Sequence, residues 1–221
     1  MNGVAVEWWG RGLDYAATLQ RQEERRAQVM AGQGTEVLAL LEHRSVITTG
    51  KRWPEGLASP EQMGARGVDF HRSSRGGLAT WHGPGQLVGY LVVDLNRLGL
   101  SVKCTVAGIE QGLIDWVGAQ GLLAARRSGH PGVWVEGGKV AAIGLHIRRG
   151  VTVHGFALNL HTQQAPWDLL VPCGIRDAAP VSLDRLLDEV PDPPRIAEEV
   201  ALSVLRGLAS RSRLDAVRGS A

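Results

Sequence analysis

The chain has 221 residues, enough to bury a sizeable hydrophobic core as one large domain or two small ones. Its net charge is only +2, which gives no electrostatic case for binding nucleic acid or an anionic membrane. Two cysteines, Cys104 and Cys173, are too few for a disulfide framework, and no apolar run approaches the ~18 residues that a membrane helix needs.

The first ten residues carry neither the basic nor the apolar stretch of a secretory signal. Together with the low number of cysteines, this N-terminus predicts a protein of the reducing cytoplasm. A functional cysteine would act there as a thiol and not in a disulfide. The histidines show no spacing such as HExxH, and no CxxC pair occurs, so we expect no structural metal. The phosphate-binding motifs GxxxxGK(S/T) and strand-GxGxxG-helix are missing, so the sequence gives no support for bound ATP or NAD.

In chain order, a helix comes first, and its apolar face is expected to begin with Tyr15, Ala16 and Leu19. Short strands and a loop follow it. The predicted elements of this part are a helix at 12–31, a buried strand at 36–41, a strand or loop at 42–50, a loop with one helical turn at 52–67 and a short strand at 68–72.

The next stretch is rich in glycine: Arg75-Gly76-Gly77-Leu78-Ala79-Thr80-Trp81-His82-Gly83-Pro84-Gly85-Gln86. Glycines let a ligand approach the backbone closely. With Arg75 at one end and His82 near the other, the stretch could form one wall of an extended polar ligand site. An ordinary glycine-rich turn before the buried strand at 87–95 explains the same residues, and the spacing alone leaves both interpretations open.

The second half begins with an amphipathic helix, for which Ser101 is the expected N-cap, and Cys104 lies inside it, off the main apolar stripe. A change to β periodicity then predicts an antiparallel meander. The elements are a helix at 102–117, strands at 133–135, 139–147 and 151–160, a short helix at 182–190 and a last helix from 191 to about 210. We therefore expect one α/β domain over residues 1–221.

Cys173 and Lys139 are the candidates for chemistry. Cys173 stands in a Pro-Cys-Gly turn, which exposes a thiol at a bend, and Lys139 follows two glycines. A thiol needs a base or a positive neighbour to act as a nucleophile near neutral pH. Taken alone, Cys173 is better explained as an inert thiol and Lys139 as a solvated hairpin lysine.

Several segments together resemble the octanoyltransferases of lipoate biosynthesis (the lipoyl/octanoyl transferase, or LipB, family). They are Glu42-His43 with Val46, Thr48 and Gly50; Arg75-Gly76-Gly77 with Thr80 and His82-Gly83-Pro84-Gly85-Gln86; Gly138-Lys139-Val140-Ala141-Ala142-Ile143-Gly144; His154-Gly155-Phe156-Ala157-Leu158-Asn159-Leu160; and Pro172-Cys173-Gly174-Ile175. The likeness covers roughly residues 13–183, and the order of the segments makes it specific.

The resemblance implies transfer of an octanoyl group from octanoyl-acyl carrier protein, through a thioester on Cys173, to the lysine of a lipoyl domain. Lys139 would take the proton of the Cys173 thiol, and backbone N–H groups or His82 would stabilise the oxyanion of the tetrahedral intermediate. Implied acceptors are the lipoyl domains of 2-oxoacid dehydrogenases and the glycine cleavage H protein. No cofactor, nucleic acid or membrane is implied, and we expect a monomer.

The resemblance also implies a fold and a substrate site. The fold is a mixed, largely antiparallel sheet flanked by helices, like the catalytic domain of biotin and lipoate ligases. The implied substrate-binding residues are Arg75, Gly76, Gly77, Leu78, Ala79, Thr80, Trp81, His82, Ala142, Ile143, Gly144, Gly155, Phe156 and Ala157.

Two departures from the family pattern stand out. Trp81 replaces a common tyrosine, which we expect to alter one wall of the acyl site, and residues 179–183 replace the usual Gly-Val-Thr-Ser-Leu.

Three other functions compete with this one. An ATP-dependent lipoate or biotin ligase shares the fold but needs no cysteine nucleophile. A cysteine hydrolase would need a Cys–His motif, and none is recognisable. A non-catalytic binder of acyl carrier protein or lipoyl domains would not need both Cys173 and Lys139. The preferred length of the acyl chain depends on pocket depth, which the sequence does not give.

Overall fold

Two β-sheets form the frame of the protein, whose structure is a computed structural model describing residues 3–50, 54–170 and 179–218. The strand order is β1-β2-β6-β10-β9-β8-β7 in the larger sheet and β4-β3-β5 in the smaller one. The larger sheet consists of β1 (Val4–Leu13), β2 (Glu36–His43), β6 (Gln86–Val92), β10 (Val151–Asn159), β9 (Gly138–Arg148), β8 (His130–Val135) and β7 (Ala124–Arg127). The smaller sheet consists of β4 (Asp69–Arg72), β3 (Val46–Thr49) and β5 (Thr80–His82).

Most strand pairs are antiparallel. Among the described strands, β1–β2 and β3–β4 are the parallel pairs. The predicted mixed, largely antiparallel sheet is therefore confirmed.

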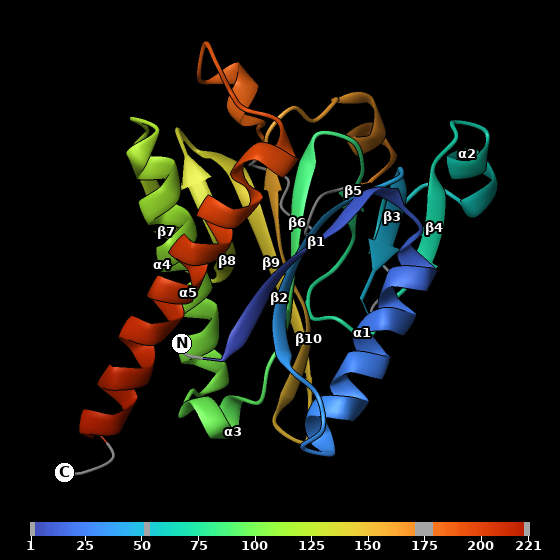
Figure 1. The fold of residues 1–221 in the computed structure, drawn as a ribbon. Coiled ribbons are helices and arrows are strands. Elements are labelled where there is room, and N and C mark those ends of the chain that lie inside the picture. Colours follow the sequence, from blue (N-terminus) through green and yellow to red (C-terminus); the bar gives the residue numbers. More distant parts are fainter. Residues whose placement is uncertain (1–2, 51–53, 171–178, 219–221) are drawn as a thin grey trace.

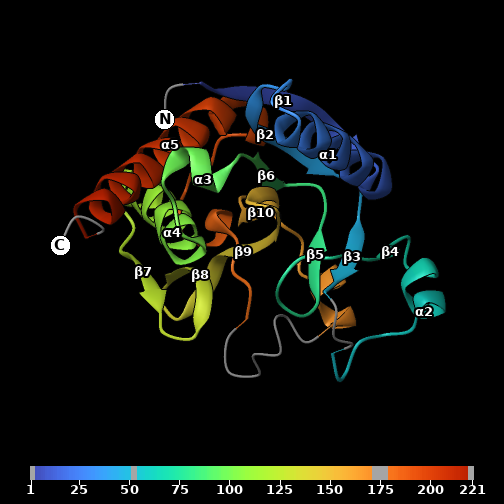
Figure 2. The same cartoon turned by 90° about the horizontal axis from the view of Figure 1, so that it is seen from below.

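Helices cover both faces of the larger sheet (Figure 1). One face carries α1 (Tyr15–Met30), and the other carries α4 (Val102–Ala119) and α5 (Pro193–Arg218). Seen from below, the smaller sheet and α2 (Pro60–Gly64) lie to one side of the larger sheet (Figure 2). The remaining helical segments are α3 (Leu95–Leu98) and the 3₁₀ turns Ala165–Leu169 and Leu183–Arg185. No helix of the described ranges is long and apolar enough to cross a bilayer.

The central strands β2 and β6 are buried on both faces, which explains their continuous apolar sequences. Successive side chains of a strand point to opposite faces. Leu38, Leu40, Leu87 and Leu91 therefore face the core beneath α4 and α5. The residues that alternate with them, including Val88 and Tyr90, face α1.

The predicted meander is present, and its two turns explain its register. Glu136 (φ 49°) and Gly137 (φ 81°) join β8 to β9, and Arg149 (φ 51°) and Gly150 (φ 84°) join β9 to β10. Two residues with positive φ make the tight turn that matches the twist of antiparallel strands.

The helix at the N-terminus buries a different face from the one expected. Tyr15, Thr18, Gln22 and Arg26 are buried, whereas Ala16 is exposed. The reason is hydrogen bonding to the sheet: the Gln22 Oε1 atom accepts from the backbone N–H of His154 at 2.8 Å. A buried polar side chain is tolerated where it is paired in this way.

Other differences concern element boundaries. The glycine-rich stretch contains strand β5, and the predicted helix at 182–190 shrinks to the 3₁₀ turn Leu183–Arg185. The last helix extends to Arg218, and strand β1 was not predicted. Ser101 is the N-cap of α4, as expected, because its hydroxyl accepts from the Cys104 N–H at 3.1 Å.

Candidate functional site

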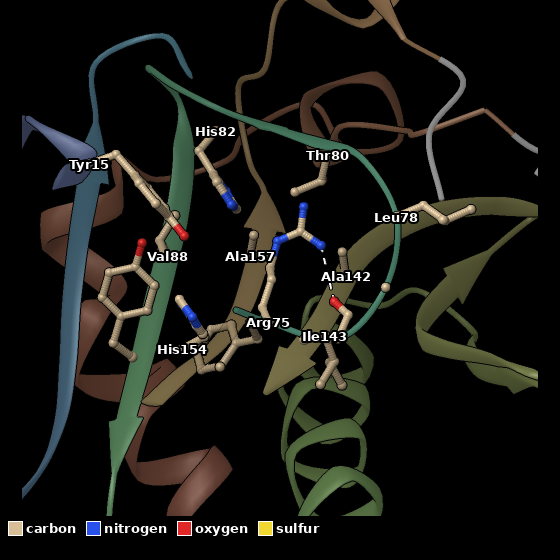
Figure 3. A pocket seen from close by; sticks show the side chains of 16 residues that line it. Tyr15, Arg75, Leu78, Thr80, His82, Val88, Ala142, Ile143, His154 and Ala157 are labelled. Atoms are coloured by element: carbon tan, nitrogen blue, oxygen red, sulfur yellow. Dashed lines mark hydrogen bonds between the residues drawn. The ribbon is translucent and has the colours of Figure 1, made fainter. Parts of the chain in front are cut away.

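A pocket of about 490 Å³, partly open to solvent, lies between the α1 face of the larger sheet and the segment 75–82 (Figure 3). Its lining comes from α1, the glycine-rich stretch, β6, β9 and β10. The lining residues are Tyr15, Arg75, Gly76, Gly77, Leu78, Thr80, His82, Val88, Tyr90, Ala142, Ile143, Gly144, His154, Gly155, Phe156 and Ala157.

The floor of the pocket is made of small residues on two neighbouring strands. Ala142 pairs with Ala157, and Gly144 pairs with Gly155, across β9 and β10. A side chain at Gly144 would meet the carbonyl oxygen of Gly76 at 3.1 Å, so this glycine also lets the opposite wall come close. Small residues facing each other across a sheet leave room for a slim apolar chain.

Arg75 is fixed in the wall by β3. Its Nη2 atom donates to the carbonyl oxygen of Thr48 at 2.6 Å and to Thr48 Oγ1 at 2.9 Å. Its Nη1 atom donates to the carbonyl oxygen of Gly76 at 3.1 Å, as the dashed line in Figure 3 shows. The guanidinium is therefore a buried, oriented positive charge beside the pocket.

His82 is buried and neutral. Burial, followed by the nearby His43, holds the pKa of His82 well below its ordinary value. The Gln86 amide donates from Nε2 to Asn159 Oδ1 at 2.9 Å and to the carbonyl oxygen of Trp81 at 3.2 Å. Its Oε1 atom therefore accepts from Nδ1 of His82 at 2.7 Å. The single proton of the His82 ring lies on Nδ1, so Nε2 cannot donate.

A chain of hydrogen bonds links the pocket to Lys139. The Asn159 Nδ2 atom donates to the carbonyl oxygens of Lys139 at 3.4 Å and of Val181 at 3.2 Å. The backbone of Lys139 also pairs with the segment at 179–181, donating to the carbonyl oxygen of Ala179 at 3.1 Å and accepting from the Val181 N–H at 3.0 Å. Ala179 stands six residues after Cys173 in the sequence. Cys173 itself, like the rest of its predicted turn, lies outside the described residues.

The half-buried Lys139 side chain passes over Gly132. Its Nζ atom lies 5.3 Å from the centre of the Trp134 ring, and a side chain at Gly132 would meet the Lys139 Cε atom at 2.5 Å. The glycine and the tryptophan on β8 therefore fix where the amine lies.

The sequence profile of the lipoyl protein ligase A/B catalytic domain matches residues 14–204, most of the chain. The chain belongs to this family. The octanoyltransferase of Chloroflexus aurantiacus is 38% identical over 222 residues, covering 98% of this chain and 99% of that relative. The octanoyltransferase of Geobacter sulfurreducens is 43% identical over 173 residues, covering 78% of this chain and 72% of that relative.

Solved structures of lipoate ligases share the fold of this lipoyl protein ligase A/B domain. Lipoate-protein ligase A bound with ATP superposes with a TM-score of 0.71 at 16% identity, covering 96% of this chain and 85% of that one. A bipartite lipoate protein ligase from Thermoplasma acidophilum gives a TM-score of 0.60 at 14% identity, covering 93% and 82%. At these identities the likeness concerns the fold alone.

In this family member, most substrate-binding residues expected from the sequence meet in one pocket. Ala79 and Trp81 do not line it. Trp81 lies between Thr80 and His82 on β5, so strand alternation turns its ring to the other side, against Trp167 with the ring centres 5.5 Å apart. We had expected Trp81, at a position where tyrosine is common, to alter the wall of the pocket. It lies instead in the core of the smaller sheet.

Four lining residues were not among the expected substrate-binding residues: Tyr15, Val88, Tyr90 and His154. Two features of the sequence could have indicated three of these residues. Val88 and Tyr90 alternate along a buried strand that follows the glycine-rich stretch, and His154 directly precedes the predicted Gly155. Tyr15 had been expected to face an apolar core. No cluster of three metal-ligating side chains occurs within the parts of the chain that the structure describes.

Proposed function

We propose that this protein is an octanoyltransferase that moves an octanoyl group from acyl carrier protein, through a thioester on Cys173, to a lysine of a lipoyl domain. Lipoyl domains of 2-oxoacid dehydrogenases and the glycine cleavage H protein are the acceptors we propose. The observation that carries the proposal is the backbone pairing of Lys139 with residues 179–181, which brings the chain that leaves Cys173 to the lysine. Relatives of nearly the same length that are named octanoyltransferase support it.

The proposed reaction has two acyl transfers. In the first, Lys139 accepts the proton of the Cys173 thiol, the sulfur attacks the thioester carbonyl of the donor, and the carrier thiol leaves with a proton. In the second, the acceptor lysine attacks the new thioester, Lys139 takes the proton of its amine, and the Cys173 thiol is restored. One thioester is broken and one amide is formed, so no ATP is consumed.

The pocket suits the acyl group of this reaction. The floor formed by Ala142, Gly144, Gly155 and Ala157 presents no bulky or charged side chain to an alkyl chain. His82 is a poor candidate for the oxyanion donor considered above, because its single ring proton is directed to Gln86. Backbone N–H groups of the glycine-rich stretch or of the Cys173 turn are the donors we propose instead.

Intact mass spectrometry tests the proposal. Incubation with octanoyl-acyl carrier protein should add one octanoyl group to the protein, and addition of a lipoyl domain should remove it and modify the domain. Cys173→Ala should abolish both steps. Cys104→Ala, which removes the half-buried thiol of α4, is the matched control and should behave like the wild type. Wild-type transfer by Cys173→Ala would disprove the thioester route.

A second reaction mixture separates the transferase from a ligase. The same protein, given free octanoate, ATP and a lipoyl domain, should yield no octanoylated domain. If product formed under these conditions and not with the acyl carrier protein donor, an ATP-dependent ligase would replace the proposed function. Calorimetry with ATP should show no saturable binding.

A further inference from the structure

We infer that His154 sets the length of the acyl chain that the pocket accepts, by closing its buried end. The inference rests on the proposed function for the identity of the chain. Its physical basis is the depth of the pocket and the unusual backbone at His154.

The pocket has an open end and a closed end. Gly76 and Gly77 are exposed, and Leu78 and Ile143 are partly exposed. At the opposite end, Tyr15, His82, Tyr90 and His154 are all at least nine-tenths buried. Figure 3 shows Leu78 and Ile143 on one side and Tyr15 and His154 on the other. An alkyl chain that enters at the open end therefore ends against these rings.

The closed end also lies far from the proposed reacting groups. Gly144 is the fifth residue after Lys139 on β9, and its partner on β10 is Gly155, next to His154. Five residues of strand span about 17 Å. A thioester placed near Lys139 would thus point its acyl chain along the floor toward His154.

The backbone of His154 adopts a left-handed conformation inside a strand, with φ of +63°. For a residue other than glycine this conformation is unfavourable, and such outliers cluster at functional sites. The Gln22 side chain stabilises the conformation by accepting the His154 N–H at 2.8 Å. Regular alternation would place His154 on the face of Phe156 and Leu158, whereas this conformation turns its ring into the pocket beside Tyr90.

The imidazole ring of His154 is uncharged and closes the buried end of the pocket. Its exposed fraction is 2%, and it packs edge-on against Tyr90 with the ring centres 6.3 Å apart. Burial, aided by the positive charge of Arg75, lowers the pKa of His154 to about 3, so the imidazole is neutral. Within the described part of the chain its Nε2 atom has no hydrogen-bond partner. Packing therefore determines where the pocket ends, and a smaller residue should deepen it.

His154→Gly is the deciding variant, because glycine accepts the positive φ and keeps the backbone N–H that binds Gln22. Arg149→Gly is its matched control: it also relieves a positive φ, of 51°, but at an exposed turn away from the pocket. Transfer rates are measured with hexanoyl, octanoyl, decanoyl and dodecanoyl carrier protein. We expect His154→Gly to raise the dodecanoyl-to-octanoyl ratio at least tenfold, and Arg149→Gly to leave it unchanged.

Binding of the free alkyl carboxylates of the same lengths, measured by calorimetry, tests the pocket without the transfer chemistry. Wild-type protein that binds octanoate but transfers nothing would refute the proposed function and leave the inference standing if His154→Gly shifts the preferred length. An unchanged length preference in folded His154→Gly would refute the inference. Should that variant fail to fold, His154→Asn replaces it, since asparagine tolerates positive φ and has a smaller side chain. An unchanged preference there would refute the inference equally.

Discussion

The side-chain amide of Asn159 donates to the backbone carbonyl of Lys139 at 3.4 Å, and it also bonds the carbonyl of Val181 at 3.2 Å. Its own carbonyl accepts from the Gln86 amide at 2.9 Å. Asn159 therefore joins β9, the segment that follows Cys173 and the end of the glycine-rich stretch. It does so from the end of β10, where it is buried.

Asn159→Leu should separate these segments. Because it leaves buried polar groups unpaired, we expect the free energy of unfolding to fall by about 1–3 kcal/mol. Acyl transfer should fall further than the loss of folded protein explains, since the segment at 179–181 would no longer be fixed beside Lys139. Denaturant unfolding and the transfer assay measure the two effects. Gln20→Ala, which removes an exposed amide on α1, should change neither. Wild-type transfer by Asn159→Leu would show that this network does not position the lysine.

Lys139 should act as a base and not merely as a positive charge. Lys139→Ala should lower acyl transfer by about 10²–10⁴ without unfolding, the usual contribution of acid–base catalysis. Lys139→Arg should be equally slow, because a guanidinium cannot accept a proton. Single-turnover acylation followed by mass spectrometry measures both. If Lys139→Arg retained most of the activity, Lys139 would be an electrostatic stabiliser of the thiolate instead.

The stability of the protein should fall as the pH drops through the range of its buried histidines. Burial lowers the pKa of His43 to about 4, and its Nε2 atom bonds the hydroxyl of Tyr90 at 2.6 Å. The unfolded chain, with an ordinary pKa near 6.5, binds a proton that the folded chain excludes between these two values. The contribution of His43 to the free energy of unfolding should therefore be constant above about pH 6.5 and fall below it.

The expected slope is about 1.4 kcal/mol per pH unit for each such group. His154, with a pKa of about 3, continues the decline to lower pH. Urea unfolding at several pH values between about 7 and 5 measures the slope, and His43→Gln should reduce it by one group's share. A slope that stays unchanged in His43→Gln would show that His43 titrates normally in the folded protein.

Gly85 should tolerate no side chain, because a Cβ atom there would lie 2.2 Å from the carbonyl oxygen of His161. Gly129 has nearly the same φ, +77° against +80°, but open space around it. Both Gly→Ala changes cost roughly 1–2 kcal/mol for the backbone conformation. Gly85→Ala should cost a further 1–3 kcal/mol or so for the steric clash. Thermal unfolding compares the two, and equal losses would contradict the close packing at Gly85.

The sequence by itself determined the local architecture and the segments of the site. Apolar runs fixed the central strands, Ser101 fixed the start of α4, and Glu136 and Gly137 fixed a hairpin turn, because each depends on interactions between residues near in sequence. The same holds for the glycine-rich stretch, whose composition allowed either a close approach to a ligand or an ordinary turn.

Only the tertiary structure decided which side chains face the pocket. Strand alternation within β5 moved Trp81 out of the pocket, and a hydrogen bond from the His154 N–H to Gln22, 132 residues away in the chain, accompanies the turn of the His154 ring into it. The buried polar face of α1 has a similar cause, since Gln22 accepts from the His154 N–H on β10 and the Arg26 Nη1 atom lies 3.4 Å from His146 Nδ1 on β9. Contacts between residues so far apart leave no periodic trace in the sequence, so neither the closed end of the pocket nor its depth could be predicted from it.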